Sequence, residues 1–420
     1  MQWGDFRDYF KGFAWKRLTA HEVDPTVSNG HEFQGIGGLR AILGDQRREQ
    51  IPTKYILLSD DGTEPQYLTS WASWYDARAN NSERSAEWRL YYSTAAGEIQ
   101  NRMRAGDLLV IGVTQRDELI LFLTRSGSER EAQLRILFGI DVDGLGPFRV
   151  RSLSEPIVLD FVTASILEQL GIAEARTPDG SDADIVADLV EELVREYGAR
   201  LPSGDTVSTL IRSRLPGVNG HDDPDDALYR WIEAEAAMYR GWEDRKIANR
   251  IRDGFVDPAG APDVSGFRQF SMAIRQSRVS RAGGALQYHF RALLELAKVP
   301  YVMEPEIDGG EVPDFLFPSK EAYEDSTFPA DQLRMLAAKF TAKDRWRQVL
   351  NEAHRIKEKH LLTMEAAISA NQMKLMTTAT LTLVIPQQIR NRYSESARPM
   401  IMTVGEFLTE IQSPYKARNV

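Results

Sequence analysis

An isolated lysine in an apolar run, with two acidic residues at set distances from it, is the best candidate for chemistry in this chain. Asp314 follows a proline, Lys339 lies in the apolar run of residues 333–340, and Glu352 comes thirteen residues after the lysine. Apolar residues on both faces of that run predict a buried central strand, where a lysine is costly unless it meets an anion or a cleft. Converging there, the two carboxylates would hold Mg²⁺ and the lysine would orient or deprotonate a water, which is the equipment for phosphodiester hydrolysis.

A strand and a helix would have to position these three side chains. The run of residues 333–340 supplies the strand, and residues 344–356 carry apolar side chains at helical spacing. On a helical wheel Glu352 falls on the flank of that stripe, almost directly below Arg345 two turns earlier. We therefore expect a helix through this segment with Glu352 facing the strand end.

Spacing alone leaves ordinary structural roles open for the same residues. Asp314 after a proline fits a turn, and Lys339 could extend from a strand end to solvent. Glu352 could pair with Arg345 or Lys357 on a solvated helix face.

The amino-acid sequence around these residues resembles that of a known family. PDFLFPS, LRMLAAKFTAKDRWRQVLNEA and MTVGEFLTEI are similar to the catalytic domain of EcoRII-type restriction endonucleases, a PD…K…E variant of the restriction-endonuclease fold. The resemblance is dense from about Ser280 to Ile411. It implies an α/β domain with a central mixed sheet flanked by helices, and a Mg²⁺-dependent Type II site-specific deoxyribonuclease. It also implies five catalytic residues: Asp314, Tyr323, Lys339, Lys343 and Glu352. Of these, Asp314 and Glu352 would bind the metal.

Two further matches concern the metal and the DNA. Gln287 stands where the family has a helix glutamate, which argues for one metal ion rather than two. Asp344, Arg345 and Arg347 match a cluster that reads C:G pairs, since arginine can donate to guanine and an acid can accept from cytosine. The resemblance thus implies double-stranded DNA as partner and a recognition site with CC and GG outer pairs.

Residues 1 to about 172 are expected to be mostly β. Short strand-like runs such as residues 54–58, 108–112 and 118–123 are separated by Gly and Asp turns, with helix candidates at 36–43 and 93–103. This pattern favours a small barrel-like domain and gives the whole chain a multidomain α+β class.

Two polar segments of this half, residues 16–35 and 74–92, contain the residue types that read base edges in DNA. Composition alone favours two solvated loops, but KRLTAHEVDPTVSNGHEFQG resembles the N-terminal effector domain of the same enzymes, a DNA-binding pseudobarrel with an N-arm and a C-arm. The resemblance places five residues on the N-arm: Lys16, Arg17, Asn29, His31 and Gln34. It places four on the C-arm, where the match is looser: Arg78, Arg84, Glu87 and Arg89.

Composition and breaker residues suggest the domain organisation. We expect an effector domain at 1–174, a linker at 175–183 and a catalytic domain at 184–420. A long helix is expected at 227–251, and such a helix in the endonuclease family often forms a homodimer interface, although core packing also explains its apolar residues. The chain lacks cysteine, a membrane-spanning apolar run, a signal-peptide core and a GxxxxGK[ST] motif, which predicts a cytoplasmic protein with no membrane partner and no nucleotide cofactor. The net charge of −10 requires that any DNA-binding surface be a local basic one.

A site-specific, effector-regulated DNA endonuclease is therefore the function we expect. Two alternatives stay open: a modification-dependent or defence nuclease that reads a different site, and a DNA-binding protein with an inactive nuclease core, to which Gln287 points.

Overall fold

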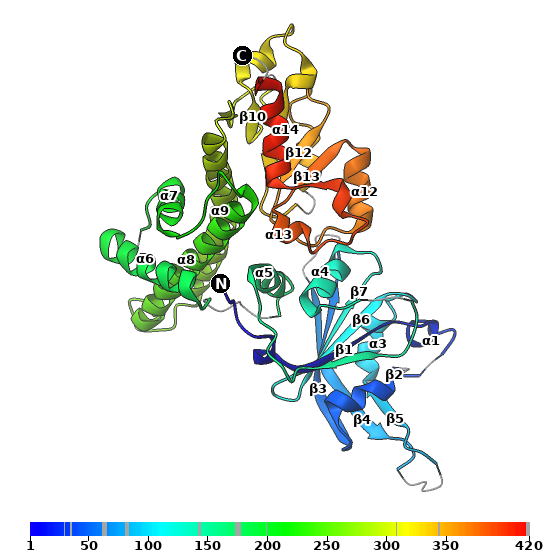
Figure 1. The fold of residues 1–420 in the computed structure, drawn as a ribbon. Coiled ribbons are helices and arrows are strands. Elements are labelled where there is room, and N and C mark those ends of the chain that lie inside the picture. Colours follow the sequence, from blue (N-terminus) through cyan, green and yellow to red (C-terminus); the bar gives the residue numbers. More distant parts are fainter. Residues whose placement is uncertain are drawn as a thin grey trace. The chain divides into compact units, whose positions relative to one another are not determined.

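The chain folds into two compact units, Gln2–Arg176 and Thr177–Val420, the second of which also includes Met1 (Figure 1). The structure is a computed structural model. It describes residues 1–28, 30–33, 36–60, 65–79, 84–141, 144–172, 178–198, 200–307, 309–342 and 345–416.

The N-terminal unit is built on one curled eight-stranded sheet, ordered β2-β5-β4-β3-β7-β6-β1-β8. Its strands are β1 (Phe10–Arg17), β2 (Glu32–Phe33), β3 (Arg48–Leu58), β4 (Gln66–Asp76), β5 (Trp88–Tyr92), β6 (Leu108–Thr114), β7 (Leu119–Thr124) and β8 (Arg149–Ser152). Leu119, Leu121 and Leu123 alternate along β7 and enter one core because successive side chains of a strand point to opposite faces. The predicted β-rich half-barrel is confirmed, and β2 and β8 are its two edges.

Short helices close this sheet. The predicted segments 36–43 and 93–103 contain η2 (Ile36–Leu39) with α2 (Arg40–Leu43), and η3 (Thr94–Ala96) with α3 (Gly97–Gln100). The sequence analysis missed η1 (Phe6–Asp8), α1 (Ala20–Val23), α4 (Glu129–Phe138) and α5 (Phe161–Gln169). In α4, Phe138 packs against the rings of Phe10, Phe13 and Phe122, so this helix covers the second face of the sheet.

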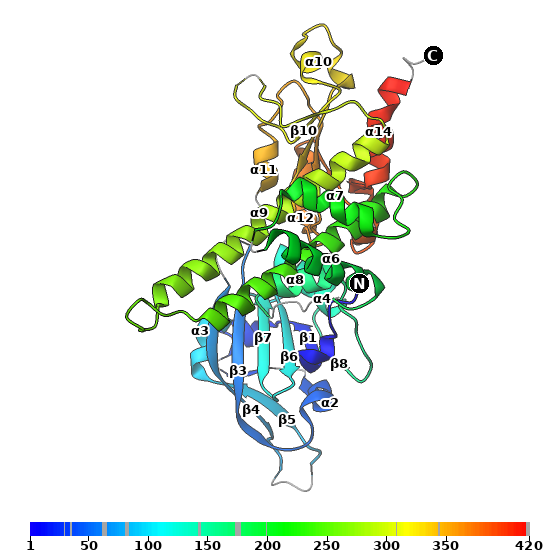
Figure 2. The ribbon, with the colours of Figure 1, turned by 90° about the vertical axis from the view of Figure 1, so that its left-hand side faces the viewer.

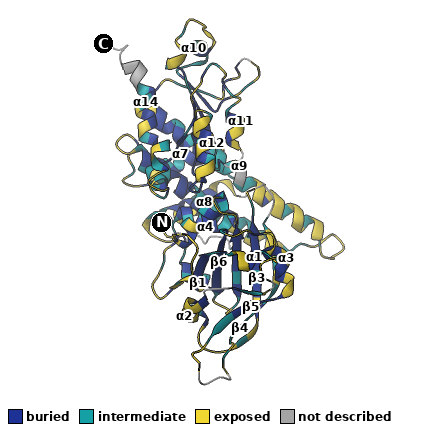
Figure 3. Ribbon diagram, turned by 90° about the vertical axis from the view of Figure 1, so that its right-hand side faces the viewer, coloured by how far each residue is buried: buried dark blue, intermediate teal, exposed yellow. Residues whose placement is uncertain are grey.

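The C-terminal unit begins with four helices, α6 (Ser181–Tyr197), α7 (Gly204–Arg214), α8 (Pro224–Asp253) and α9 (Val264–Leu296). α8 and α9 form a long hairpin (Figure 2), and exposed residues gather at its far end (Figure 3). Ile251 and Phe267 are among the exposed large apolar residues of these two helices. The helix that carries Gln287 starts at Val264, since the Asp263 side chain caps α9 by accepting from the N–H of Gly266 at 2.8 Å. In the described part of the chain no helix is both long and apolar enough to cross a membrane.

A six-stranded mixed sheet, ordered β14-β13-β12-β11-β10-β9, forms the rest of this unit. Its strands are β9 (Val302–Met303), β10 (Phe315–Phe317), β11 (Arg334–Ala338), β12 (Lys359–Leu362), β13 (Leu381–Val384) and β14 (Ile401–Met402). β11 is central, parallel to β12 and antiparallel to β10, and Leu336, Ala337 and Ala338 are buried as the apolar run predicts. The predicted mixed sheet flanked by helices is confirmed.

Helices pack on this sheet and connect its strands. They are α10 (Lys320–Glu324), η4 (Ala330–Gln332), α11 (Trp346–Val349), α12 (Ala370–Thr378), α13 (Gln387–Arg390), η6 (Arg398–Met400) and α14 (Val404–Lys416). Phe290 of α9 and Phe407 of α14 contact each other and the aromatic rings of β10. This aromatic layer fixes α9, and with it Gln287, beside the strand that follows Asp314.

The predicted helix of residues 344–356 is wrong in its second half. α11 ends at Val349, the chain turns, and Ala353 has a φ of 50°, in the left-handed region that a continuing α-helix excludes. Ala353 and Ile356 are nevertheless buried, so the apolar spacing predicts their burial correctly but not the backbone conformation. Glu352 lies in this turn and not on a helix face.

Candidate active site

Asp314 and Lys339 meet at the carboxyl end of β11. Asp314 directly precedes β10 and Lys339 directly follows β11, and the antiparallel pairing of these strands brings the two residues together. The Oδ2 atom of Asp314 accepts from the Lys339 ammonium at 2.8 Å and from the backbone N–H of Ala338 at 2.7 Å. The Asp314 side chain is 10% exposed and that of Lys339 24% exposed, so the pair is shielded but reachable from solvent.

Gln287 of α9 completes the contacts of Asp314. Its amide Nε2 donates to Oδ1 of Asp314 at 2.7 Å. Both carboxylate oxygens of Asp314 are thus hydrogen-bonded, and a neutral amide stands where a second acid would add negative charge.

Glu352 faces the same place from the turn after α11. Its Oε2 atom is buried and has no hydrogen-bond partner. Burial raises the pKa of the Glu352 carboxyl above the usual glutamate value, and the nearby Asp314 carboxylate raises it further, while the charges of Lys339 and Lys359 lower it. Asp314, Lys339 and Glu352 therefore converge as the sequence analysis expects, although Glu352 reaches the site from a turn.

The two carboxylates suit a divalent cation. No group of three or more His, Cys, Asp or Glu side chains that could hold a metal occurs among the described residues. Asp314 and Glu352 are two ligands, and Mg²⁺ keeps several waters when protein carboxylates bind it. A buried carboxylate oxygen without a partner, next to a second carboxylate, is the local feature that a bound cation would satisfy.

We expect Glu352→Gln to stabilise the metal-free fold. A carboxyl whose pKa is raised on folding disfavours the folded state above that pKa, and the penalty vanishes as the pH falls through it. The free energy of unfolding should rise by about 1 kcal/mol at slightly alkaline pH, the low end for an unsatisfied buried polar atom. Denaturant unfolding with EDTA at alkaline and acidic pH measures this. Glu358→Gln, at an exposed position, is the control, and a gain that does not depend on pH would contradict the electrostatic cause.

Tyr323 contacts Arg355, which follows Glu352 by three residues. Tyr323 is buried in α10, its ring faces the Arg355 guanidinium at 5.6 Å, and that guanidinium donates to the backbone oxygens of Tyr323, Asp325 and Phe328. The contacts of Tyr323 thus join α10 to the chain three residues after Glu352.

The other predicted residues of this unit lie just before and within α11. Lys343 and Asp344 lie outside the described residues. Arg345 and Arg347 are exposed, and the Arg347 guanidinium lies over the ring of buried Trp346 at 4.7 Å. Both side chains lie on the segment that connects Lys339 to Glu352.

The N-arm residues that the structure describes, Lys16, Arg17 and His31, have different partners. Lys16 is only 3% exposed, and its ammonium pairs with the buried Glu22 at 2.8 Å. Arg17 makes a two-bond ion pair with Glu131, at 2.9 and 2.5 Å. In this conformation both cations serve the fold and are not presented to a phosphate.

Of the remaining N-arm residues, the His31 ring lies edge-on against Tyr91 and Tyr92. Asn29 and Gln34 are outside the described residues.

Three of the four C-arm residues, Arg78, Glu87 and Arg89, come together where β4 ends and β5 begins. Arg89 pairs with Glu87 at 2.8 Å and with Glu32 at 3.1 Å, and Arg78 pairs with Glu87 from the other side. Arg84 is exposed. Glu32 was missed by the sequence analysis, because its partner Arg89 is distant in sequence and becomes its neighbour only through the β2–β5 pairing.

Two residues near the active site were also missed, Glu311 and Lys359. Lys359 begins an apolar strand, the same signal that identified Lys339, and Glu311 precedes Asp314 by three residues.

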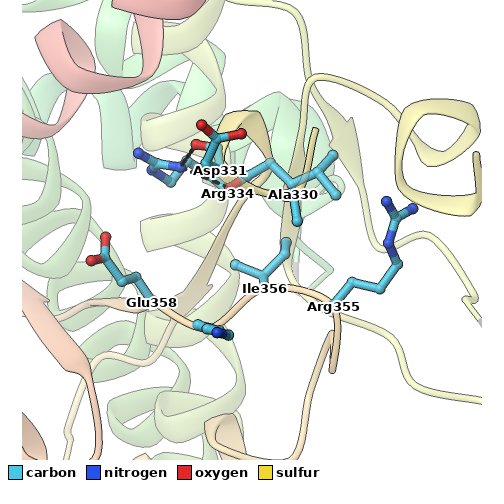
Figure 4. Close-up of a pocket in the computed structure, with 8 residues that line it drawn as sticks. Ala330, Asp331, Arg334, Arg355, Ile356 and Glu358 are labelled. Atoms are coloured by element: carbon cyan, nitrogen blue, oxygen red, sulfur yellow. Dashed lines mark hydrogen bonds between the residues drawn. The ribbon is translucent and has the colours of Figure 1, made fainter. Parts of the chain in front are cut away.

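A pocket of about 450 Å³ opens beside the start of β11 (Figure 4). Arg334 and Arg355 are among its lining residues, whereas Lys339 follows the other end of that strand. The pocket is therefore not the candidate active site.

Comparison with known proteins finds a family match within the C-terminal unit. Residues 239–408 match the family model described as "EcoRII C terminal". The chain is 34% identical over 224 residues to the Type II restriction enzyme EcoRII of Escherichia coli, which covers 53% of this chain and 54% of that enzyme. The chain thus matches about half the length of this curated relative.

Two solved structures show a weaker likeness. Metal-depleted Ecl18kI in complex with uncleaved DNA is 18% identical, with a TM-score of 0.42, covering 57% of this chain and 87% of that one. A complex of the restriction endonuclease PspGI with substrate DNA is 15% identical, with a TM-score of 0.37, covering 54% and 92%. These TM-scores are low, and the assignment rests on the sequence matches. Residues 239–408, which include Asp314, Lys339 and Glu352, thus match the EcoRII C-terminal family model, and over 224 residues the chain is homologous to a Type II restriction enzyme.

Proposed function

We propose that this protein cleaves double-stranded DNA at a specific sequence by Mg²⁺-dependent hydrolysis of a phosphodiester bond. The observation that carries the proposal is the convergence of Asp314, Lys339 and Glu352 within the segment that matches the EcoRII C-terminal family. Two carboxylates beside one ammonium are the groups that such a hydrolysis requires.

Each residue of the site would have its own role. Asp314 and Glu352 would hold the cation, and Gln287 would fix the orientation of Asp314. A bound Mg²⁺ lowers the pKa of a water and offsets charge on the phosphate. Lys339 would orient the attacking water or, in its neutral form, take its proton. Lys343 would contact the phosphate, and we keep Tyr323 as a further active-site residue because it contacts the chain just after Glu352.

Recognition is proposed to rest on Asp344, Arg345 and Arg347. The exposed Arg345 and Arg347 can donate to guanine edges in the major groove, and Asp344 would accept from cytosine. A site with CC and GG outer pairs follows, with each such contact discriminating by about 1–3 kcal/mol.

The N-terminal unit is proposed to be an effector domain, 1–174, joined by a linker, 175–183, to the catalytic domain, 184–420. The side chains of Arg78, Glu87 and Arg89 meet where β4 ends and β5 begins and are each at least 35% exposed, unlike those of Lys16 and Arg17, which supports a DNA-binding role for this unit. On this proposal the domain binds a second copy of the recognition site and regulates cleavage.

The protein is proposed to be cytoplasmic and to assemble as a homodimer through the C-terminal unit. Supporting the dimer, the α8–α9 hairpin exposes Ile251, Val264, Phe267 and Met272, apolar side chains that a second subunit would cover.

Plasmid cleavage tests the function directly. Unmethylated plasmids with one or several CC(N)GG sites are incubated with the protein and Mg²⁺ or EDTA. We expect discrete fragments with Mg²⁺ alone, whose sequenced ends give the site, and faster cutting of plasmids with several sites.

Other outcomes would favour the alternatives. Sequence-specific DNA binding without cutting of any plasmid would indicate an inactive nuclease core, which the neutral Gln287 beside Asp314 makes worth testing. Cutting only of methylated DNA would indicate a modification-dependent nuclease.

A further inference from the structure

The turn that carries Glu352 is held by a buried lysine that contacts only its main chain there. Lys359, the first residue of β12, is 5% exposed. Its ammonium donates to the backbone oxygen of Glu352 and, at 2.7 Å, to that of Ala353. A buried ammonium is costly unless its N–H groups find acceptors, and these two carbonyls supply them.

Glu311 holds the same turn from the other side. Its Oε2 atom accepts from the backbone N–H of Ala353 at 2.7 Å, and its Oε1 atom pairs with the His354 imidazole at 2.7 Å. Glu311 lies in the turn closed by the Ile307–Glu311 bridge, three residues before Asp314. This contact ties the segment that bears Asp314 to the segment that bears Glu352.

These contacts determine where the Glu352 carboxylate lies. α11 ends at Val349, and Ala353 adopts a φ of 50°, so no regular element fixes the turn. The Oε2 atom of Glu352 has no hydrogen-bond partner, so the position of this oxygen depends on the backbone. The backbone is in turn fixed by Lys359 and Glu311, both of which lie outside the turn.

We propose that Lys359, with Glu311 as a second anchor, is a positioning residue that holds Glu352 at the distance from Asp314 that a divalent cation needs. The inference rests on the proposed metal-dependent function and extends it to two residues that touch neither substrate nor metal. Groups that orient metal ligands act on metal affinity itself, and their loss costs about 10- to 100-fold in affinity or activity.

The test measures metal affinity as well as activity. Mn²⁺ binding to the DNA-free protein is followed by the electron paramagnetic resonance signal of free Mn²⁺, and the Mg²⁺ concentration for half-maximal plasmid cleavage is measured alongside. For Lys359→Met we expect Mn²⁺ binding to weaken about 10- to 100-fold and the half-maximal Mg²⁺ concentration to rise likewise, with excess Mg²⁺ restoring part of the rate. Lys359→Arg, which keeps a charged donor, should stay close to the wild type.

Lys357→Met is the matched control, because Lys357 is two residues away and exposed. It should leave both quantities unchanged. A Lys359→Met protein that binds Mn²⁺ as the wild type does, and loses only stability or maximal rate, would overturn the proposal.

Glu311 provides an independent pair of variants should Lys359→Met fail to fold. Glu311→Gln keeps an oxygen to accept from Ala353, whereas Glu311→Leu removes it. We expect only the leucine variant to weaken Mn²⁺ binding, and equal affinities in the two variants would contradict the anchoring role. If the wild type neither binds Mn²⁺ nor cuts DNA, the proposed function fails first and this inference with it. If the wild type does both and Lys359→Met does as well, only the inference fails.

Discussion

Asp314→Ala is expected to abolish DNA cleavage, with a loss of at least about 10³-fold in rate, because several kcal/mol of metal-derived stabilisation disappear with the ligand. Asp314 is the residue on which the site depends most directly. It accepts from Lys339, Ala338 and Gln287 at 2.7 to 2.8 Å, and it would bind the cation with the same carboxylate. Plasmid cleavage at saturating Mg²⁺ measures the loss, and Mn²⁺ binding should be lost with it.

Asp314→Asn separates charge from structure. The amide keeps an oxygen that can accept from the Ala338 N–H, so the fold should survive, but without the negative charge the variant should be as inactive as alanine. DNA binding with Ca²⁺ in place of Mg²⁺ should persist in both variants. Asp331→Ala, at an exposed residue near the start of β11, is the control that should cut normally. Loss of DNA binding together with cleavage would make Asp314 a structural residue instead.

The strand half of this site was predictable because its signal is local. An apolar run with a terminal lysine describes β11 and Lys339, since a strand buried on both faces shows its burial in its own residues. The proline and aspartate before a second apolar run likewise mark the start of β10. Antiparallel pairing of β10 with β11 then brings Asp314 to Lys339.

The Glu352 half was not predictable in the same way. The apolar spacing around Glu352 predicts a helix, but the backbone conformation is set by hydrogen bonds of Ala353 with Lys359 and with Glu311. Glu311 is 42 residues from Ala353 in the sequence. A helical wheel includes only residues close together in the sequence, so it cannot predict such contacts. The family resemblance named Glu352 as a candidate, while its position in a turn is known only from the fold.

The N-terminal unit shows the same limit for charged residues. Its strands follow from alternation, yet Arg17 and Glu131 are separated by 114 residues and Lys16 is buried against Glu22. Sequence cannot distinguish an arginine offered to DNA from one that is neutralised within its own domain. The C-arm cluster of Arg78, Glu87 and Arg89 forms because neighbouring strands pair, and it is therefore the part of this surface that deserves mutagenesis first.

Lys339→Met is the second substitution with a large expected effect, a loss of about 10²- to 10⁴-fold in cleavage rate, the usual range for removing a proton-transfer group. The methionine keeps the length and apolar packing of the side chain and removes only its charge. DNA binding with Ca²⁺ should be unchanged, and Lys320→Met, at a partly exposed lysine of α10, should cut normally.

Metal binding then distinguishes the role of Lys339 from that of Asp314. The ammonium lies 2.8 Å from the Asp314 Oδ2 atom and carries the same sign as the cation, so it competes with the cation for this oxygen. Removing it should leave Mn²⁺ affinity as strong as in the wild type or stronger, whereas Asp314→Ala should lose it. A Lys339→Met protein that cuts slowly while binding Mn²⁺ well would support a direct role of the ammonium at the attacking water. Weakened Mn²⁺ binding would instead mean that Lys339 acts by holding Asp314 in place, and the water-activating role would have to be assigned to another group.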